Sequence, residues 1–346
     1  MSEDDSGPRG PEVRGPGSVE ALEQQLEERR RSGGDAAVAQ SCLELAQAYA
    51  ERGSLRQAYP LFEQALQIFE MRDDRANQVL CLKALAGQCY RQGAWHRALD
   101  LYHQAIRLLT DPEDEAEIAL THSQIGSVYQ GQGDWEKAQA SYLESLKIRE
   151  RLGDTRGMAL LYNNLGAVFA RQGRWDQAEQ AWTTCLALHE GSGDHTGQAI
   201  TLGNLGSLAQ QRGLWSDALA WYARSLPLYR QSGDPLGEAT IHNNVGLVSK
   251  QIGRLGQALE AYRKGLTLLQ TLGDSLRATV TMYNMAMIHE DQGDYREALR
   301  LLEQVIEMDR RIGHPDLRRD METFRRVRQK LDMERDTQKM EEERAP

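Results

Sequence analysis

The amino-acid sequence predicts an all-α protein, a solenoid of seven helix-turn-helix repeats with a helical cap at each end. Three observations lead to this prediction. The composition of the 346 residues is helical, because proline is rare and β-branched residues are sparse beside Ala, Leu, Gln, Glu and Arg. A glycine recurs seven times at a spacing of 40 residues. Segments with apolar residues at i, i+3, i+4 and i+7 flank each of these glycines.

Three columns of residues repeat in register over the seven copies. A glycine ends the first helix, because a positive φ angle is favourable mainly for glycine. An alanine five residues later lets the two helices approach each other. A large residue one turn further on fills the space between neighbouring units, and its burial contributes about 1.5–3 kcal/mol. The columns are Gly53, Gly93, Gly133, Gly173, Gly213, Gly253 and Gly293; Ala58, Ala98, Ala138, Ala178, Ala218, Ala258 and Ala298; and Phe62, Tyr102, Tyr142, Trp182, Tyr222, Tyr262 and Leu302.

A second sequence pattern marks the junctions between successive repeats. An aspartate recurs every 40 residues, and in most copies a glycine precedes it. The glycine ends one helix, and the aspartate is expected to cap the next by accepting hydrogen bonds from its free N–H groups. These aspartates are Asp74, Asp114, Asp154, Asp194, Asp234 and Asp274.

The ends of the chain differ from the repeats. Residues 1–18 are rich in proline and glycine and are predicted to be a disordered N-terminal tail, and residues 344–346 to be a C-terminal tail. Residues 19–34 read as an N-terminal capping helix. The seven repeats occupy residues 35–314. A charged segment with one apolar face, residues 315–343, is predicted to be a C-terminal capping helix, since repeat arrays need such an element over the last core; its alternative role is a docking or coiled-coil segment.

The repeat resembles the tetratricopeptide repeat (TPR) family. Leu165-Gly166-Phe169-Ala178-Trp182 and Ile125-Gly126-Tyr129-Ala138-Tyr142 are similar to the family pattern. The chain departs from that pattern in its period of 40 residues, in the missing helix-ending proline, and in Ala209, Ser249 and His289, which replace the first-helix aromatic. The longer period is similar to that of LGN/Pins-type scaffolds. The resemblance implies a right-handed superhelical solenoid whose first helices line a concave groove.

The sequence contains no recognisable active site. We find no phosphate-binding loop, H-E-x-x-H, G-x-S-x-G or calcium-loop motif. The histidines, among them His96, His122, His242 and His289, have no metal-ligand spacing. We therefore expect a protein that is not an enzyme and has no metal site, no cofactor and no small-molecule substrate.

Charge, hydropathy and cysteine content indicate which partners and which cellular compartment to expect. The formal net charge of −10 disfavours nucleic acid, because phosphate groups would be repelled. No apolar stretch is long enough to span a membrane. Four cysteines without C-x-x-C spacing, and an N-terminus without a secretory signal, predict a cytoplasmic protein with reduced thiols.

One column of polar residues is a candidate binding site. In the family the groove holds extended peptides, and the matching first-helix positions here carry amides, which can pair with any peptide backbone. Asparagine is a mediocre helix former, so its recurrence calls for a reason; the alternative is that it only suits a solvated face. The predicted groove residues are Gln124, Asn163, Asn164, Asn204, Asn243, Asn244, Asn284, Lys83, Tyr90, Arg91, Arg171, Lys250 and Tyr283.

These observations predict a non-catalytic scaffold or adaptor that binds an extended peptide segment of a protein partner in the concave groove. The cations in the middle of the groove predict a partly acidic peptide. The first alternative is an autoinhibited regulatory module, closed by its C-terminal helix until a partner displaces that helix. The second is a structural subunit of a signalling or enzyme assembly that docks through its convex face.

Overall fold

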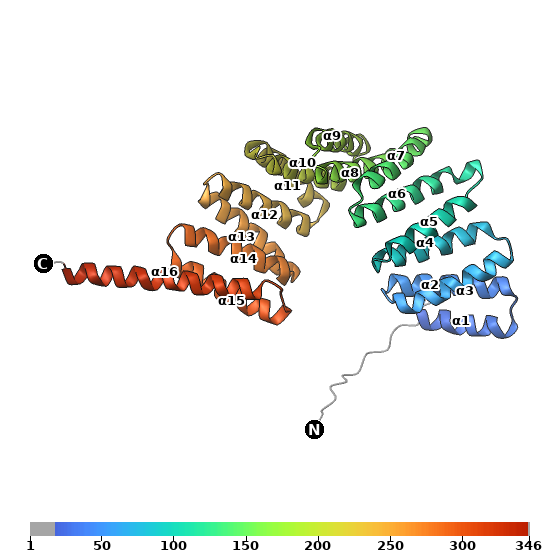
Figure 1. Ribbon diagram of the computed structural model, residues 1–346, viewed down its shortest axis with the longest axis horizontal. Coiled ribbons are helices and arrows are strands. Elements are labelled where there is room, and N and C mark those ends of the chain that lie inside the picture. Colours follow the sequence, from blue (N-terminus) through green and yellow to red (C-terminus); the bar gives the residue numbers. More distant parts are fainter. Residues whose placement is uncertain (1–17, 345–346) are drawn as a thin grey trace, which may run out of the picture. The chain divides into compact units, whose positions relative to one another are not determined.

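The computed structural model describes residues 18–344, without the side chains of residues 339 and 341–344, and this part of the chain is helical with no β-strand (Figure 1). The predicted tails at 1–18 and 344–346 lie outside it apart from Ser18 and Arg344. The helices are α1 (Val19–Ser32), α2 (Asp35–Glu51), α3 (Leu55–Met71), α4 (Arg75–Arg91), α5 (Trp95–Leu108), the short 3₁₀ helix η1 (Pro112–Asp114), α6 (Glu115–Gln132), α7 (Trp135–Leu152), α8 (Thr155–Arg171), α9 (Trp175–Ser192), α10 (His195–Gln211), α11 (Trp215–Ser232), α12 (Pro235–Gln251), α13 (Leu255–Leu272), α14 (Ser275–Asp291), α15 (Tyr295–Ile312) and α16 (Leu317–Arg344).

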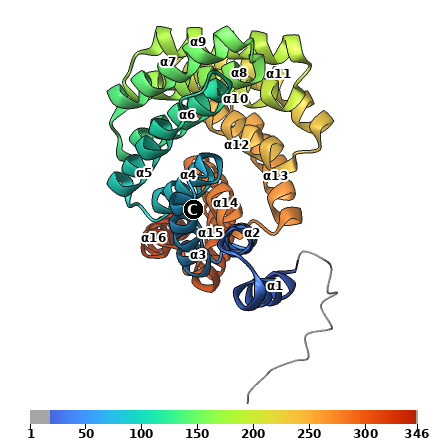
Figure 2. The same ribbon diagram turned by 90° about the vertical axis from the view of Figure 1, so that its right-hand side faces the viewer.

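The chain divides into two compact units, which we call unit 1 (residues up to Asn164) and unit 2 (residues from Leu165). In each unit the even-numbered helices from α2 to α14 are the first helices of the repeats, and the odd-numbered helices from α3 to α15 are the second helices. From α1 to α7 and from α9 to α16 each helix packs against its neighbours in the chain, and in unit 2 the first helices α10 and α12 also contact each other. Figures 1 and 2 show the antiparallel pairs stacked within each unit. The predicted all-α solenoid fold is confirmed.

The glycines of the first repeating column have the predicted conformation. All seven have positive φ angles, between +71° at Gly173 and +79° at Gly293. Alanines of the second column are fully buried, which brings the two helices of each repeat close together. The structure thus confirms the physical reason assigned to both columns.

The glycines inside the first helices have a different function, because an aromatic ring of the second helix lies directly against them. A Cβ atom added at Gly166 would lie 2.6 Å from Trp182, and one added at Gly206 would lie 2.4 Å from Tyr222. These contacts are far shorter than a van der Waals contact. Only glycine therefore allows the ring to be buried at these positions.

The aspartate caps form at five of the six predicted positions, for example at Asp234, whose side chain accepts a hydrogen bond from Gly237 N at 2.9 Å. The prediction for Asp114 is wrong. Helix α5 ends early, at Leu108, and Asp111-Pro112 starts the 3₁₀ turn η1. Asp114 is the last residue of that turn, and its carboxylate accepts from Asp111 N at 3.0 Å instead of capping α6.

The two end helices fall on the segments predicted as caps. Helix α1 buries Val19 and Leu26 against the core of unit 1. Helix α16 buries Val327 and Leu331, with Phe324 packed beside them, against the core formed by α13, α14 and α15 in unit 2. Beyond Leu331 its described side chains are exposed, and the helix continues past the end of α15 (Figure 1).

Candidate functional site

The predicted amide column lies on the first helices of both units. Each of its side chains is half-buried, so it borders the solvent without being part of the core. Within unit 1 the Oε1 atom of Gln124 is buried and has no hydrogen-bond partner among the described residues. Such an acceptor is costly unless it is satisfied. The column consists of Gln124 on α6 and Asn164 on α8 in unit 1, and of Asn204 on α10, Asn244 on α12 and Asn284 on α14 in unit 2.

Asn244 is linked to the packing of the second helix below it. Burial raises the pKa of the Tyr222 hydroxyl, while hydrogen bonds with Ser207 and Asn244 act in the opposite direction. The Tyr222 hydroxyl also donates to Gln210 Oε1 at 3.0 Å. The Tyr222 hydroxyl therefore interacts with polar side chains of two first helices, Gln210 on α10 and Asn244 on α12.

The two asparagines that precede the column occupy a different position. Asn243 Nδ2 donates to Thr281 Oγ1 of α14 at 2.9 Å, and its Oδ1 is buried without a described partner. This side chain therefore links two neighbouring first helices of unit 2. Asn163 holds the equivalent place on α8 and is also half-buried.

The predicted cations differ in how strongly they are engaged. In unit 1 Lys83 forms an ion pair with Glu117, and Arg91 is exposed. In unit 2 Lys250 Nζ lies 3.5 Å from Asp291 Oδ2, and Arg171 is exposed. The positive charge at the two lysines is thus partly neutralised inside the protein.

The two predicted aromatic residues both have protein neighbours. Tyr90 packs edge-on against Trp95 in unit 1, with ring centroids 5.4 Å apart. In unit 2 the C-terminal helix α16 covers Tyr283: the Arg319 guanidinium lies 4.8 Å from the ring centroid, and the Thr323 hydroxyl is 3.4 Å from the Tyr283 hydroxyl. Sequence reasoning alone did not reveal this contact.

An ion-pair cluster holds α16 on the same first helix. Arg326 Nη2 lies 2.8 Å and Lys330 Nζ 2.9 Å from the carboxylate of Glu290, which is only 8% exposed. Burial raises the pKa of Glu290, but the hydrogen bonds and charges of Lys330 and Arg326 outweigh it, so the pKa is lowered overall. The charged form of Glu290 is therefore bound to α16.

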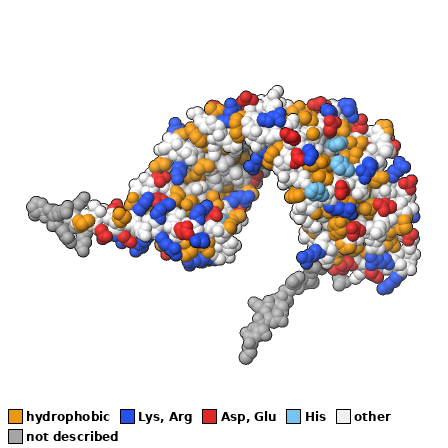
Figure 3. Space-filling view, viewed as in Figure 1, with side chains coloured by type: hydrophobic (Ala, Val, Ile, Leu, Met, Phe, Trp, Pro, Cys, Tyr) orange, Lys and Arg blue, Asp and Glu red, His pale blue; other side chains and the backbone are white. Residues whose placement is uncertain are grey.

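Other chemical groups form no reactive centre in the described part of the chain. The side chains of residues 18–344 that the structure includes hold no cluster of three His, Cys, Asp or Glu residues able to bind a metal ion. The four cysteines are buried free thiols, and burial raises the pKa of Cys81 to about 12. No described helix combines the length and apolar character needed to cross a bilayer. On the face drawn in Figure 3, acidic and basic side chains are interspersed over each unit.

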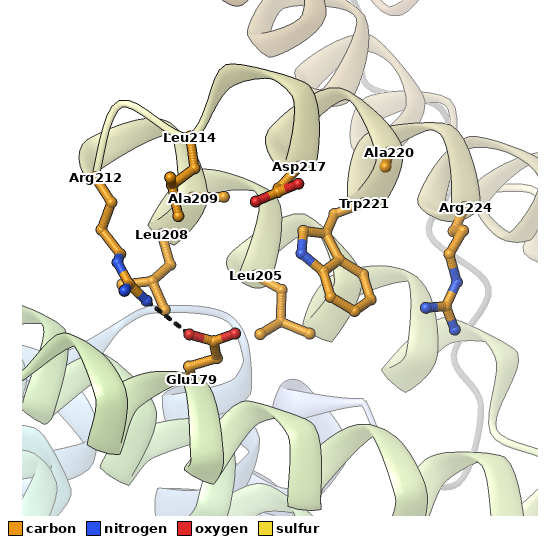
Figure 4. Close-up of a pocket in the computed structure, with 10 residues that line it drawn as sticks. All are labelled: Glu179, Leu205, Leu208, Ala209, Arg212, Leu214, Asp217, Ala220, Trp221 and Arg224. Atoms are coloured by element: carbon orange, nitrogen blue, oxygen red, sulfur yellow. Dashed lines mark hydrogen bonds and ion pairs between the residues drawn. The ribbon is translucent and has the colours of Figure 1, made fainter.

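Sequence reasoning also missed a cavity of about 280 Å³ in unit 2. It lies between the second helices α9 and α11, over the C-terminal half of α10 (Figure 4). Its apolar walls include Ala209 and Trp221, and the guanidinium group of Arg212 donates to Glu179 at 2.7 Å on its rim. The departure of Ala209 from the aromatic column was the available signal.

Comparison with known proteins supports the family on sequence and the fold on structure. The sequence profile of the tetratricopeptide repeat family matches residues 35–111, 117–181, 157–231 and 237–311, which together make up more than half of the chain. A search of curated proteins found no match.

The solved structures that are similar to the chain include the following three. The apo form of RapI is 15% identical, with a TM-score of 0.67 over 86% of this chain and 82% of that one. A signal transduction ATPase (STAND) with a tetratricopeptide repeat sensor from Pyrococcus horikoshii is 14% identical, with a TM-score of 0.65 over 91% of this chain and 50% of that one. BtubC from P. vanneervenii is 19% identical, with a TM-score of 0.55 over 68% of this chain and 92% of that one.

The chain spans about half the length of the P. horikoshii ATPase, and identities this low show a shared fold only. The profile matches, the positive-φ glycines and the glycine–aromatic contacts between paired helices together establish the family. This chain belongs to the tetratricopeptide repeat family.

Proposed function

We propose that this protein is a non-catalytic adaptor that binds an extended peptide segment of a partner protein along the first helices of its repeats. The observation that carries the proposal is the amide column, five half-buried Gln or Asn side chains at one position of successive first helices. Each amide offers one acceptor and two donors, so it can pair with a peptide backbone of any sequence. A stable helix alone would favour Ala, Leu or Glu at these positions.

The free energy of a few hydrogen bonds limits how much affinity the amide column can provide. Each hydrogen bond is worth about 0.5–1.5 kcal/mol net, so four contribute about 2–6 kcal/mol. A micromolar complex needs about 8 kcal/mol. Side chains beside the column must supply the difference and the specificity. The exposed Arg91 and Arg171 favour a peptide with acidic residues, since Lys83 and Lys250 already have acidic neighbours.

A peptide selection with matched variants tests this proposal. A random peptide library is selected on the full chain, and the affinity of the enriched peptides is measured by titration calorimetry. We expect the combined variant Asn164→Ala, Asn204→Ala, Asn244→Ala and Asn284→Ala to bind at least tenfold more weakly. The control replaces four exposed glutamines on second helices, Gln67, Gln180, Gln257 and Gln270, by alanine.

Circular dichroism confirms that both variants are helical before binding is compared. The control variant should retain wild-type affinity, because its substitutions lie on the other layer of helices. If the asparagine variant binds every selected peptide as tightly as the wild type does, the amide column is not the binding site.

A second candidate function is regulation by α16. The observation that favours it is the cover that α16 places over Tyr283, one of the predicted groove residues, together with the ion pairs of Arg326 and Lys330 to Glu290. A peptide approaching this end of unit 2 would compete with α16 for the same aromatic ring.

Charge reversal on α16 separates the two functions. The double variant Arg326→Glu and Lys330→Glu should weaken the contact of α16 with α14 while the buried Val327 and Leu331 remain. Under the regulatory function, peptide affinity rises in this variant and in a chain shortened after residue 314. An unchanged affinity in a folded charge-reversal variant identifies α16 as a cap only.

A further inference from the structure

The cavity between α9 and α11 exists because one repeat lacks a ring that its neighbours have. Three of the seven repeats place an aromatic residue at the position of Ala209, namely Tyr49, Tyr129 and Phe169. In the preceding repeat of unit 2, the guanidinium group of Arg174 lies 4.6 Å from the centroid of the Phe169 ring. The repeat fold therefore accommodates an aromatic ring with a cation over it at this position. With Ala209 at the equivalent position, the space that the ring would occupy is unfilled.

Trp221 forms one side of the open pocket that the missing ring leaves. The two neighbouring repeats have Ala181 and Ala261 at the position of Trp221. Of these three second helices, α11 is the one with a large side chain at that position. Ser249 in the next repeat also lacks a ring, but the position equivalent to Trp221 there is the small Ala261. Figure 4 shows the Trp221 indole pointing into the space above Leu205. The Arg224 guanidinium lies 5.0 Å from the centroid of this indole.

The walls and the rim of the cavity differ in chemistry. Leu205 and Leu208 are each 2% exposed and form an apolar floor. On the rim Arg212 donates a hydrogen bond to Glu179. The Arg224 side chain is half-exposed, and its Nη2 atom lies 3.5 Å from Glu190 Oε1, which is too long for a strong charge-assisted hydrogen bond. An apolar cavity of about 150 Å³ holds a benzene molecule, so about 280 Å³ is enough for one aromatic side chain.

A ring from a partner protein is the occupant that suits this cavity, because the rings of residues 18–344 are buried or half-buried in their own repeats. None of the Trp, Tyr and Phe side chains of this chain is exposed, and the sequence outside residues 18–344 has no aromatic residue. A second copy of the chain therefore has no ring to offer in its folded state. Aromatic side chains seated in such pockets commonly provide much of the binding energy of an interface.

We propose that the cavity around Ala209 is an anchor site for a partner protein, which inserts a Phe, Tyr or Trp side chain and places a neighbouring carboxylate against Arg224. The site lies between second helices and is separate from the amide column on the first helices. Binding here does not require the peptide-binding function proposed above.

The test uses the full chain and a library of nine-residue peptides with one aromatic residue at the centre. The variant Ala209→Phe restores the ring found in Phe169 and fills the cavity, and Trp221→Ala removes its wall without adding volume. We expect peptides enriched on the wild type to carry an acidic residue beside the ring, and to bind each variant at least tenfold more weakly. The control Gln211→Phe adds the same ring at an exposed position outside the cavity and should bind as the wild type does.

Each outcome decides the proposal. Should Ala209→Phe fail to fold, Trp221→Ala supplies the result. If the selected peptides bind the wild type and a folded cavity variant equally, the anchor-site proposal is wrong. It is also wrong if the library yields the same peptides on the wild type and on that variant. The asparagine variant of the first helices should keep full affinity for these peptides, which distinguishes failure of this site from failure of the amide column.

Discussion

Single residues set the distance between the two helices of a repeat. In the first helices of unit 2, Gly206 lies against Tyr222 and Gly246 against Tyr262, and a Cβ atom at either glycine would meet the ring at 2.4 or 2.7 Å. Both tyrosines are fully buried. The close approach of helix and ring therefore depends on the absence of one methyl group.

The variant Gly206→Ala tests this dependence. The added methyl group must displace the Tyr222 ring, whose hydroxyl donates a hydrogen bond to Gln210 and also hydrogen-bonds with Ser207. We expect the free energy of unfolding to fall by about 1–3 kcal/mol, as for overpacked cores. Chemical denaturation measures the change. The control Gly256→Ala has open space around its added Cβ and should leave stability unchanged or slightly raised; equal losses in both variants would contradict the packing argument.

At the scale of elements, the contact between α15 and α16 contains a buried pair of acids. Asp309 is 0% and Asp320 2% exposed. The pKa of Asp309 is raised from its usual 3.8 to about 6, because the carboxyl is buried and lies against that of Asp320. His314 and Thr279 act in the opposite direction, and Arg319 donates to Asp320 at 3.0 Å. The pair therefore opposes the docking of α16 when both carboxyls are charged.

The sign of the pH dependence follows from these shifts. A carboxyl with a raised pKa binds a proton in the folded state first, so the docking of α16 is strengthened as the pH falls through 6 towards 4.5. Below 4.5 the lowered pKa of Glu290 acts oppositely, since its ion pairs with α16 are lost on protonation. The variant Asp309→Asn should raise the free energy of unfolding at pH 7 by about 1 kcal/mol or more and flatten the dependence between pH 4.5 and 7.

Thermal denaturation at pH 5 and pH 7 checks this expectation. The control Asp336→Asn changes an exposed acid of the same helix and should have little effect. If Asp309→Asn and Asp336→Asn behave alike at both pH values, the acid pair does not control α16.

The elements also show which features could be predicted from sequence. Glycine and aspartate punctuation predicts helix ends well, because these residues act through their own backbone and side chain. The prediction failed at Asp114, where the early end of α5 at Leu108 changes the role of the aspartate. The contact of α16 with Tyr283 depends on Arg319, which is 36 residues away in the sequence. The cavity at Ala209 depends on Trp221, which is 12 residues away. A column of one residue type at a fixed period reveals neither.

At the scale of the whole molecule, stability is expected to be local. Among the described helices most contacts join neighbours along the chain or successive first helices, such as α10 and α12 in unit 2, and α16 also packs on α14. Repeat proteins of this kind behave approximately as a sum of repeat stabilities and nearest-neighbour interfaces. A defect in one repeat should therefore weaken its neighbours and leave distant repeats intact.

The variant Tyr262→Ala tests this locality. Tyr262 is fully buried in the core of unit 2 that α13 shares with α14 and α15, and loss of such a ring costs about 3–5 kcal/mol. We expect amide hydrogen exchange to accelerate in α12 to α15, while α2 to α5 in unit 1 exchange at the wild-type rate. The matched variant Tyr102→Ala, in α5, should give the reverse pattern, because that ring belongs to the core of unit 1. Equal acceleration in both units for either variant would mean that the chain unfolds as one cooperative structure, and a partner bound to one unit would then stabilise the other as well.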